Sequence, residues 1–473
     1  MVIQIPQKFV AGDVRAWQHC HRRVWYDHNP PDGYAVEADR FEELIKYFGE
    51  LHENGVKERL GVMVEAKDSE HTRQLIEDRT PAIYQPQFVD EEIGLEGRPD
   101  FLLLQDDGVY QVADAKFAKS LKKHPEIRIQ IALYRMLARS DPDALVYLGN
   151  GETETVGDKA NKNRDAFLSS IRDILSQGGP PDVHFGESKC GECPYDIVCR
   201  PGFIESDALT LVYGLDARSV PGLVEQGIDT MTKLASADPS AIRDVPYLNG
   251  EKKGRAVLQA QSQVSGEIRF IERPNLPDGT WVHFDIETNP LSTQFDEEVY
   301  LWGFLTPPYE KNNFEHVWSS SGPNEDRRAW DEFLGFVRKY RDAYEKLTLV
   351  HFHSFELTKI KLYASRYEME DDPTVAWLLG DESPLFDLLP AVRNSIALPL
   401  TGYGLKKICK HENLVNFQWE LPESGSQWSM VRYNDFLVAS DAGEQADIAN
   451  EIRAYNRDDV RATRALETWL RDL

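Results

Sequence analysis

Residues 97–116 read GRPDFLLLQDDGVYQVADAK. Two short apolar runs on either side of an Asp-Asp-Gly turn predict a β-hairpin. Asp100 lies at the start of the first strand, and Asp114 and Lys116 lie at the end of the second. Because side chains alternate along a strand, Asp114 and Lys116 share one face. Two carboxylates supply hard oxygen ligands for Mg²⁺ or Mn²⁺, and the lysine can orient or deprotonate an attacking water.

A second pair of residues follows on a predicted helix, where Gln130 and Tyr134 are one turn apart. Asp100, Asp114-x-Lys116 and Gln130-x-x-x-Tyr134 in this order resemble the core of the PD-(D/E)xK nucleases, in particular the RecB-type branch. The resemblance implies a restriction-endonuclease-like domain over residues 1–204. It also implies that both aspartates bind the metal, that Lys116 activates water or stabilises developing charge, and that Gln130 and Tyr134 shape the site.

The RecB-type pattern also carries a His-Glu pair on a helix upstream of the hairpin. His52-Glu53 occupies that place, on a predicted helix that begins near Phe41 and continues through Glu58. The resemblance implies that His52 joins the metal shell; a His52 that faces solvent is the alternative.

Four cysteines flank this region. Cys20 stands alone, whereas Cys190, Cys193 and Cys199 form a Cys-x₂-Cys-x₅-Cys group. Such a group is typical of a metal-ligand loop, and either zinc or an iron–sulfur cluster accepts four thiolates. One distant cysteine before the nuclease core and three after it resemble the iron–sulfur staple of RecB-family nucleases. The resemblance implies a structural 4Fe–4S cluster on these four residues; zinc and four unconnected cysteines are the alternatives.

Composition limits the classes of protein to consider. A chain of 473 residues predicts two to four domains. It has no apolar run long enough for a membrane span, and its N-terminus lacks the pattern of a secretory signal, so we expect a cytoplasmic protein. The net charge of −26 repels phosphate at long range. Nucleic-acid binding would therefore need metal ions or local basic patches, such as Lys116, Lys119, Lys122 and Lys123.

The middle of the chain, residues 205–272, contains short predicted helices punctuated by glycine. This pattern resembles a helix-hairpin-helix module, which presents backbone N–H groups to phosphate. Lys252, Lys253 and Arg255 would assist such binding. A purely structural helical spacer is an equally good interpretation.

The last part, residues 273–473, follows a proline-rich linker. Asp285 and Glu287 project from one face of a predicted strand. A helix from Ile448 to about Leu470 places Tyr455 and Asp459 on the apolar face that begins with Ile448 and Ile452. A carboxylate on such a face is costly without a partner such as a metal.

These residues resemble the DEDDy exonucleases of the RNase H-like superfamily. The resemblance implies a two-metal site on Asp285, Glu287, Glu356 and Asp459, with Tyr455 orienting the water. Glu356 departs from the family, in which this acid is commonly aspartate, and Asp387 is a rival for its place.

The fold class expected overall is an α/β multidomain chain: a PD-(D/E)xK domain, a helical helix-hairpin-helix-like middle and an RNase H-like domain. The expected function is metal-dependent hydrolysis of DNA, exonucleolytic or at ends, in repair or in defence against foreign DNA. The substrate would be single-stranded DNA or duplex ends. Because no phosphate-binding loop of the Gly-x₄-Gly-Lys-[Ser/Thr] type occurs, a helicase or defence-system partner would supply unwinding. An RNA-directed exonuclease and a non-catalytic nucleic-acid-binding or assembly protein with degenerate sites are the alternatives.

Overall fold

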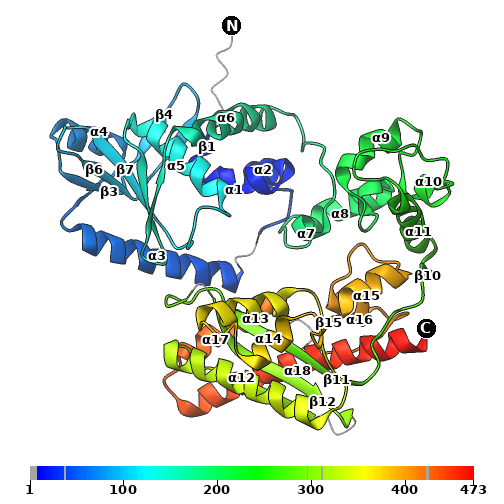
Figure 1. The fold of residues 1–473 in the computed structure, drawn as a ribbon. Helices are drawn as coiled ribbons and strands as arrows, with labels where there is room; N and C mark the ends of the chain where they lie inside the picture. The colour runs from blue at the N-terminus through cyan, green and yellow to red at the C-terminus, as the bar shows by residue number, and fades with distance from the viewer. Residues whose placement is uncertain (1–7, 37–38, 296, 310–312, 422–424) are drawn as a thin grey trace. The chain divides into compact units, whose positions relative to one another are not determined.

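The computed structural model describes residues 8–36, 39–295, 297–309, 313–421 and 425–473 (Figure 1). The N-terminal residues on which the exclusion of a secretory signal depends lie outside these ranges. The chain divides into two compact units, Met1–His184 and Phe185–Leu473. The boundaries expected at residues 204 and 272 therefore remain predictions, and the cysteine-rich loop belongs to the second unit. No helix among the described residues is both long and apolar enough to span a membrane.

The first unit is built on a six-stranded sheet with the order β2-β3-β6-β7-β8-β9 and a small sheet with the order β1-β5-β4. Its strands are β1 (Phe9–Val10), β2 (Val64–Glu65), β3 (Ala82–Tyr84), β4 (Phe88–Asp90), β5 (Leu95–Gly97), β6 (Phe101–Leu104), β7 (Tyr110–Lys116), β8 (Ala144–Leu148) and β9 (Thr153–Val156). Its helices are α1 (Val14–His19), α2 (His21–His28), α3 (Arg40–Leu60), α4 (Ser69–Glu77), α5 (Pro125–Ala138) and α6 (Asn161–Leu175), with the 3₁₀ turns η1 (Ala11–Asp13) and η2 (Asp158–Ala160).

The predicted hairpin is confirmed as β6 and β7, which pair antiparallel. Both faces of the hairpin are buried, which explains why its strands read as nearly continuous apolar runs. Leu102 and Val112 join the core that α5 and α6 cover, whereas Phe101 and Ala113 pack against Val56 of α3. Asp114 and Lys116 follow Val112 at even spacing, so they share its face of the sheet.

The second unit begins with short helices, and from Leu209 onward they surround a small apolar core of their own. They are α7 (Glu187–Cys190), α8 (Asp196–Glu205), α9 (Val220–Val224), α10 (Met231–Ala235) and the longer α11 (Glu251–Ser265), with η3 (Leu209–Leu211) and η4 (Ala217–Ser219). The glycine-punctuated helices predicted for the middle of the chain are thereby confirmed. A two-stranded sheet joins β10 (Arg269–Phe270) to β16 (Ile396–Ala397), so this region pairs directly with the last part of the chain.

A five-stranded sheet with the order β13-β12-β11-β14-β15 forms the centre of the second unit. Its strands are β11 (Thr280–Asn289), β12 (Glu298–Thr306), β13 (Asn313–Trp318), β14 (Leu347–His351) and β15 (Leu385–Asp387). The surrounding helices are α12 (Pro323–Ala343), α13 (Phe355–Arg366), α14 (Pro373–Leu379), α15 (Leu388–Ser395), α16 (Leu405–Lys410), α17 (Ser426–Val438) and α18 (Ala442–Asp472).

Alternation along β11 decides which side chains meet which helices. Phe284 and Ile286 enter the core covered by α12, α13 and α14. Asp285 and Glu287 therefore point to the opposite face, which α17 and α18 cover. The predicted C-terminal helix is confirmed as α18, drawn in red in Figure 1, and its apolar side is buried against this sheet.

Candidate metal centres

Three carboxylates converge in the second unit. Asp285 and Glu287 of β11 and Asp459 of α18 each offer an oxygen, and these oxygens lie within 4.8 Å of one another. Among the described residues, this is the one group of three or more histidine, cysteine or acidic side chains so closely spaced. Glu287 and Asp459 are buried and Asp285 is half-buried. Oxygen ligands at this density are what Mg²⁺ and Mn²⁺ prefer.

The electrostatics of the cluster support the same interpretation. Burial, reinforced by the neighbouring charges of Asp459 and Glu287, holds the pKa of Asp285 well above its usual range. Burial and the charge of Asp459 raise the pKa of Glu287 to about 8, and burial raises the pKa of Asp459. Because these carboxylates resist being ionised at the same time, a bound cation is needed if all of them are to carry charge.

Asn456 is a site residue that the sequence analysis missed. It is fully buried on α18, and its Nδ2 donates to Oδ2 of Asp285 at 2.7 Å and to Oε1 of Glu287 at 3.4 Å. Gly303 of β12 is the register partner of Asp285. A Cβ at Gly303 would overlap Oδ1 of Asn456 and lie 2.8 Å from the ring of Phe314. Glycine inside a strand often marks such a close approach, so Gly303 was the available signal.

Gly303→Ala should therefore displace Asn456 and lower both stability and activity. Overpacking of a tight site typically costs about 1–3 kcal/mol, which thermal unfolding would detect as a lower Tm. Adding Asn456→Ser should restore space and recover Tm, while the two acids remain without their amide donor. A Gly303→Ala protein with the Tm and activity of wild type would show that Asn456 is not held as described.

Further polar groups surround Asp459. Trp419 Nε1 donates to Oδ1 of Asp459 at 2.7 Å, and Lys406 Nζ donates to the hydroxyl of Tyr455 at 3.3 Å. The charge of Lys406 partly offsets the effect of burial on the pKa of Asp459. Tyr455 is buried one turn before Asp459 and hydrogen-bonds to it. The predicted stripe of Ile448, Ile452, Tyr455 and Asp459 is confirmed as a buried face of α18.

Glu356 lies near the cluster without joining its closest group. It is buried at the start of α13, and its charge contributes to the raised pKa of Asp285. Its Oε2 is 3.3 Å from Nδ1 of His351 and accepts no hydrogen bond from a described residue. Asp387 has a different role, because its Oδ1 accepts from the N–H groups of His353 at 2.8 Å and Leu389 at 3.0 Å. Asp387 thus caps α15, and Glu356 remains the predicted fourth ligand.

In the first unit, the hairpin brings together Asp100, Asp114 and Lys116. Lys116 Nζ lies 2.5 Å from Oδ1 of Asp114, and Oδ2 of Asp100 accepts from the N–H of Ala115 at 2.8 Å. Burial raises the pKa of Asp100, and the charge of Asp114 raises it further. Burial alone would lower the pKa of Lys116, but the charges of Asp114 and Asp100 outweigh it and raise the pKa. Lys116 is therefore a fixed cation, which fits orientation of water or charge stabilisation better than proton abstraction.

Tyr134 of α5 closes this site from the side. It is buried, and burial together with the charge of Asp114 raises its pKa. Gln130 lies half-buried one turn earlier on α5. The close packing of α5 depends on Gly97, because a Cβ there would lie 2.5 Å from Leu137 and 3.1 Å from Tyr134. The glycine of the opening motif thus makes room for the helix that carries Gln130 and Tyr134.

Helix α3 carries both His52 and Glu53, whose contacts differ. His52 Nε2 lies 2.9 Å from the carbonyl oxygen of Tyr147 and its ring packs edge-on against Phe117. The charge of Glu53 instead acts on Asp100 and raises its pKa. Oε1 of Glu53 accepts from the hydroxyl of Tyr84 at 2.8 Å and from Nε2 of Gln85 at 2.7 Å. The expectation that His52 joins the metal shell stays a prediction, and Glu53 is a second candidate on the same helix.

Comparison with known protein families finds a match for each of the two parts of the chain that carry a candidate metal centre. Residues 10–200 match the PD-(D/E)XK nuclease superfamily, and residues 282–471 match the RNase_H superfamily. The chain therefore combines a PD-(D/E)XK nuclease domain with a C-terminal RNase H-like domain. The expected α/β multidomain fold class with these two domains is confirmed.

Other comparisons add little to these domain assignments. No curated protein matches the chain. The crystal structure of SSO0001 is similar to 42% of this chain and 88% of its own, with 14% identity and a TM-score of 0.25. A likeness of this size supports no inference about function.

The cysteines are divided between the two units. Cys20 lies in the unit that carries the PD-(D/E)XK hairpin, whereas Cys190, Cys193 and Cys199 lie on α7, α8 and the turn between them. The Sγ of Cys190 accepts from the N–H of Gly186 at 3.5 Å. Within the described ranges, no three cysteine sulfurs come within 4.8 Å of one another. The 4Fe–4S cluster therefore stays an expectation from resemblance.

Proposed function

We propose that this protein is a metal-dependent nuclease that hydrolyses phosphodiester bonds in DNA, acting exonucleolytically or at ends. The observation that carries the proposal is the convergence of Asp285, Glu287 and Asp459 within 4.8 Å in the RNase H-like domain. Buried or half-buried acids with raised pKa values, which the charge of Lys406 compensates only in part, are destabilising unless they bind metal. The match of both domains to nuclease-containing superfamilies supports a nucleic-acid substrate.

In the RNase H-like domain, Asp285, Glu287 and Asp459 would hold divalent metal, with Glu356 as a further ligand. Bound Mg²⁺ or Mn²⁺ would neutralise charge on the phosphate and lower the pKa of a water. Asn456 fixes the carboxylates of Asp285 and Glu287 through its amide donors. The hydroxyl of Tyr455, held by Lys406, is available to orient water.

In the PD-(D/E)XK domain, Asp100 and Asp114 would hold the metal. Glu53 would add its negative charge to theirs. The fixed charge of Lys116 stabilises negative charge that develops on the phosphate. Tyr134, which is buried and lies near enough to Asp114 for that charge to raise its pKa, would shape the site. Gln130, on the same helix face, would contact the substrate strand.

A cleavage assay tests this function. Wild-type protein should hydrolyse end-labelled DNA in the presence of Mg²⁺ or Mn²⁺ and lose this activity in EDTA. Single- and double-stranded DNA and RNA are compared in parallel, and the product ladder gives polarity. Hydrolysis of RNA alone would support the RNA-directed alternative, and no hydrolysis with either metal would contradict the proposed function.

The four cysteines are proposed to hold a 4Fe–4S cluster, with Cys20 as the distant ligand of Cys190, Cys193 and Cys199. The proposal is supported by donor chemistry alone, because four thiolates suit such a cluster, while no three of these sulfurs lie within 4.8 Å of one another among the described residues. The cluster would supply a structural link rather than chemistry.

Protein purified without oxygen should be brown and absorb near ~400 nm, as thiolate-bound iron–sulfur centres do. Cys193→Ser should lose this colour and the bound iron, whereas Cys409→Ser, the change at a buried cysteine of α16, should keep both. A colourless protein with stoichiometric zinc would contradict the cluster.

A further inference from the structure

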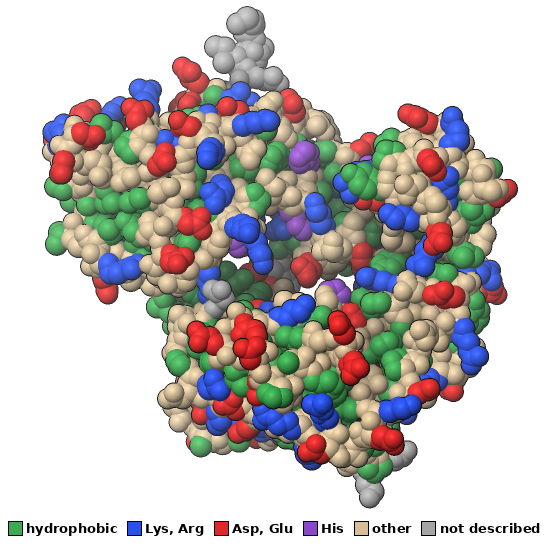
Figure 2. Space-filling model, in the orientation of Figure 1, with side chains coloured by type: hydrophobic (Ala, Val, Ile, Leu, Met, Phe, Trp, Pro, Cys, Tyr) green, Lys and Arg blue, Asp and Glu red, His purple; other side chains and the backbone are tan. Residues whose placement is uncertain are grey.

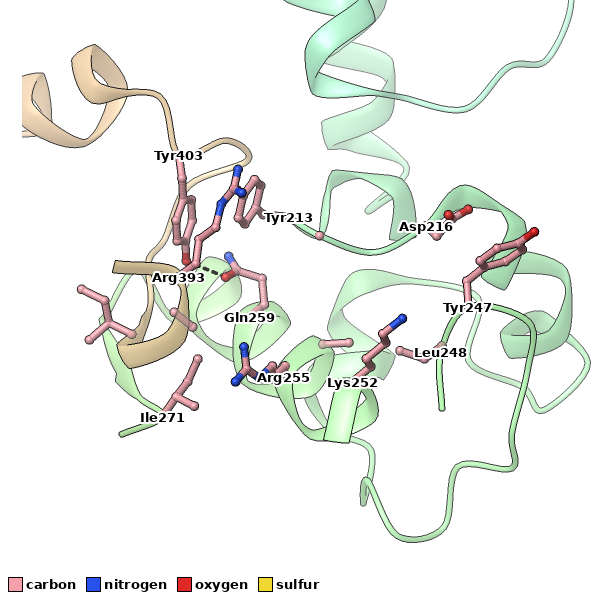
Figure 3. Close-up of a pocket in the computed structure, with 14 residues that line it drawn as sticks. Tyr213, Asp216, Tyr247, Leu248, Lys252, Arg255, Gln259, Ile271, Arg393 and Tyr403 are labelled. Atoms are coloured by element: carbon pink, nitrogen blue, oxygen red, sulfur yellow. Dashed lines mark hydrogen bonds between the residues drawn. The ribbon is translucent and has the colours of Figure 1, made fainter. Parts of the chain in front are cut away.

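A cavity of about 580 Å³ lies in the second unit, and its lining residues include none of the acids of the candidate metal centre (Figure 3). One wall is α11, another is β16 with Arg393 of α15, and the loop at Tyr213 and the turn at Tyr247 complete it. A volume of this size lies within the range of ligand-binding pockets in proteins.

The cavity is cationic in a strongly acidic protein. Lys252 and Arg255 of α11 and Arg393 of α15 line it, and all three are exposed. None of the three forms an ion pair within 4.0 Å of another described residue, whereas Lys253 pairs with Asp244 at 2.5 Å. The acid on the lining, Asp216, is already paired with Arg218 at 2.6 Å. In a chain of net charge −26, three lining cations that form no ion pair with a described residue favour an anionic ligand, although the charge of Lys252 also acts on Asp216.

Aromatic rings accompany these cations. Tyr213 and Tyr403 stack with centroids 4.0 Å apart, and the hydroxyl of Tyr403 donates to Oε1 of Gln259 at 2.7 Å (Figure 3). Tyr247 is 49% exposed and has a φ of 65°, which is strained for a residue other than glycine. The Arg218 guanidinium covers its ring at 3.5 Å from the centroid. Exposed aromatic rings beside a cationic groove bind unpaired bases and phosphates of single strands.

The same segment of chain connects the cavity with the carboxylates. Tyr403 forms part of the cavity wall, and Lys406, three residues later, donates to the hydroxyl of Tyr455. Three residues span at most about 11 Å even when fully extended. The cavity wall and a side chain that contacts the metal centre are therefore carried by one short segment of chain.

We propose that this cavity binds the phosphodiester backbone and an unpaired base of the single strand that the RNase H-like site hydrolyses. Lys252, Arg255 and Arg393 contact phosphates, and Tyr247 offers a ring to a base. This assignment rests on the proposed nuclease function, and it makes the region between the two nuclease domains a strand-guiding element rather than a spacer.

The proposal is tested by measuring the binding of an end-labelled oligodeoxythymidine with fluorescence anisotropy. Lys252→Gln with Arg393→Gln is compared with Arg243→Gln with Lys346→Gln, which removes the same charge at exposed positions outside the cavity. Both are made in full-length Asp285→Asn protein in EDTA, so that no strand is hydrolysed. The cavity variant should bind at least about tenfold more weakly, and its salt slope should fall by about 1.4. The control variant should match its parent.

A second pair of variants tests the aromatic contact. Tyr247→Phe should retain affinity, whereas Tyr247→Ala should lose about tenfold, as expected for a lost base stack. Equal oligonucleotide affinities in the two charge variants would overturn the proposal. If the cavity variant lost affinity for thymidine monophosphate but not for the oligonucleotide, the cavity would be assigned to a free nucleotide. That result would also overturn the proposal. Absence of hydrolysis by wild type would instead refute the nuclease function, since the binding comparison requires no cleavage.

Discussion

Asp285→Asn should lower hydrolysis by the RNase H-like domain by about 10²–10³-fold, the usual cost of losing one group that stabilises transition-state charge. Asparagine keeps the shape of the side chain and can still accept from Asn456, so the loss would report the missing charge. The rate is measured in Lys116→Ala protein, in which the other domain cannot contribute. Asp447→Asn, the same change at an exposed position of α18, is the control and should leave the rate unchanged.

The same substitution should stabilise the protein in EDTA. The pKa of Asp285 is raised in the folded state, so between the ordinary and the raised pKa the folded protein binds more protons than the unfolded chain. The contribution of Asp285 to the stability of the metal-free wild type therefore falls as pH rises. Asp285→Asn should remove this fall, and thermal unfolding at several pH values should show the largest gain in Tm at the highest pH. A lower Tm than wild type in EDTA would contradict a crowded acidic cluster.

Lys116→Ala should lower hydrolysis by the PD-(D/E)XK domain by about 10²–10³-fold. The loss follows because Lys116 is a fixed cation beside Asp114 whose charge is available to the phosphate. It also leaves two buried carboxylates uncompensated, so Tm in EDTA should fall. The rate is measured in Asp285→Asn protein, so that the RNase H-like domain is silent.

Two further variants make the prediction for Lys116 specific. Lys122→Ala removes an exposed lysine from the basic segment after the hairpin and should leave the rate unchanged. Lys116→Met should lose as much activity as Lys116→Ala, because the charge rather than the length of the side chain is needed. Full activity in Lys116→Met would assign the chemistry to other residues.

The hairpin and the acidic strand could be predicted because period-two alternation and turn chemistry are local properties. Asp114 and Lys116 share a face for the same reason that Asp285 and Glu287 do. The buried face of α18 was equally visible, because its apolar positions recur at helical spacing up to Tyr455 and Asp459. In each case the chemistry lies on an element whose pattern is strong.

The exact residue on α3 could not be predicted. Neighbouring residues on a helix point about 100° apart, so His52 and Glu53 face different surroundings. The choice between them depends on where α3 packs on the sheet, as shown by the contact of Val56 with Phe101 and Ala113. The charge of Glu53 acts on Asp100, while His52 as a metal ligand stays a prediction.

Asn456 escaped prediction because a single amide on the buried face of α18 has no distinctive pattern. Its role depends on β12 lying beside β11 with Gly303 opposite Asp285, a tertiary relation. The cationic cavity is similar, since Arg393 is far from Lys252 in sequence and the pairing of β10 with β16 brings their regions together. Charged side chains of both signs are mixed over the visible face of the protein, so composition alone would not reveal such a site (Figure 2).

Metal-dependent cleavage of end-labelled DNA by wild type and by the double variant Asp285→Asn with Lys116→Ala tests the central claim most directly. Wild type should cleave with Mg²⁺ or Mn²⁺, and the double variant should leave the substrate intact while it keeps a cooperative thermal transition. Cleavage by the double variant at the rate of wild type would show that neither acidic site is the catalytic centre.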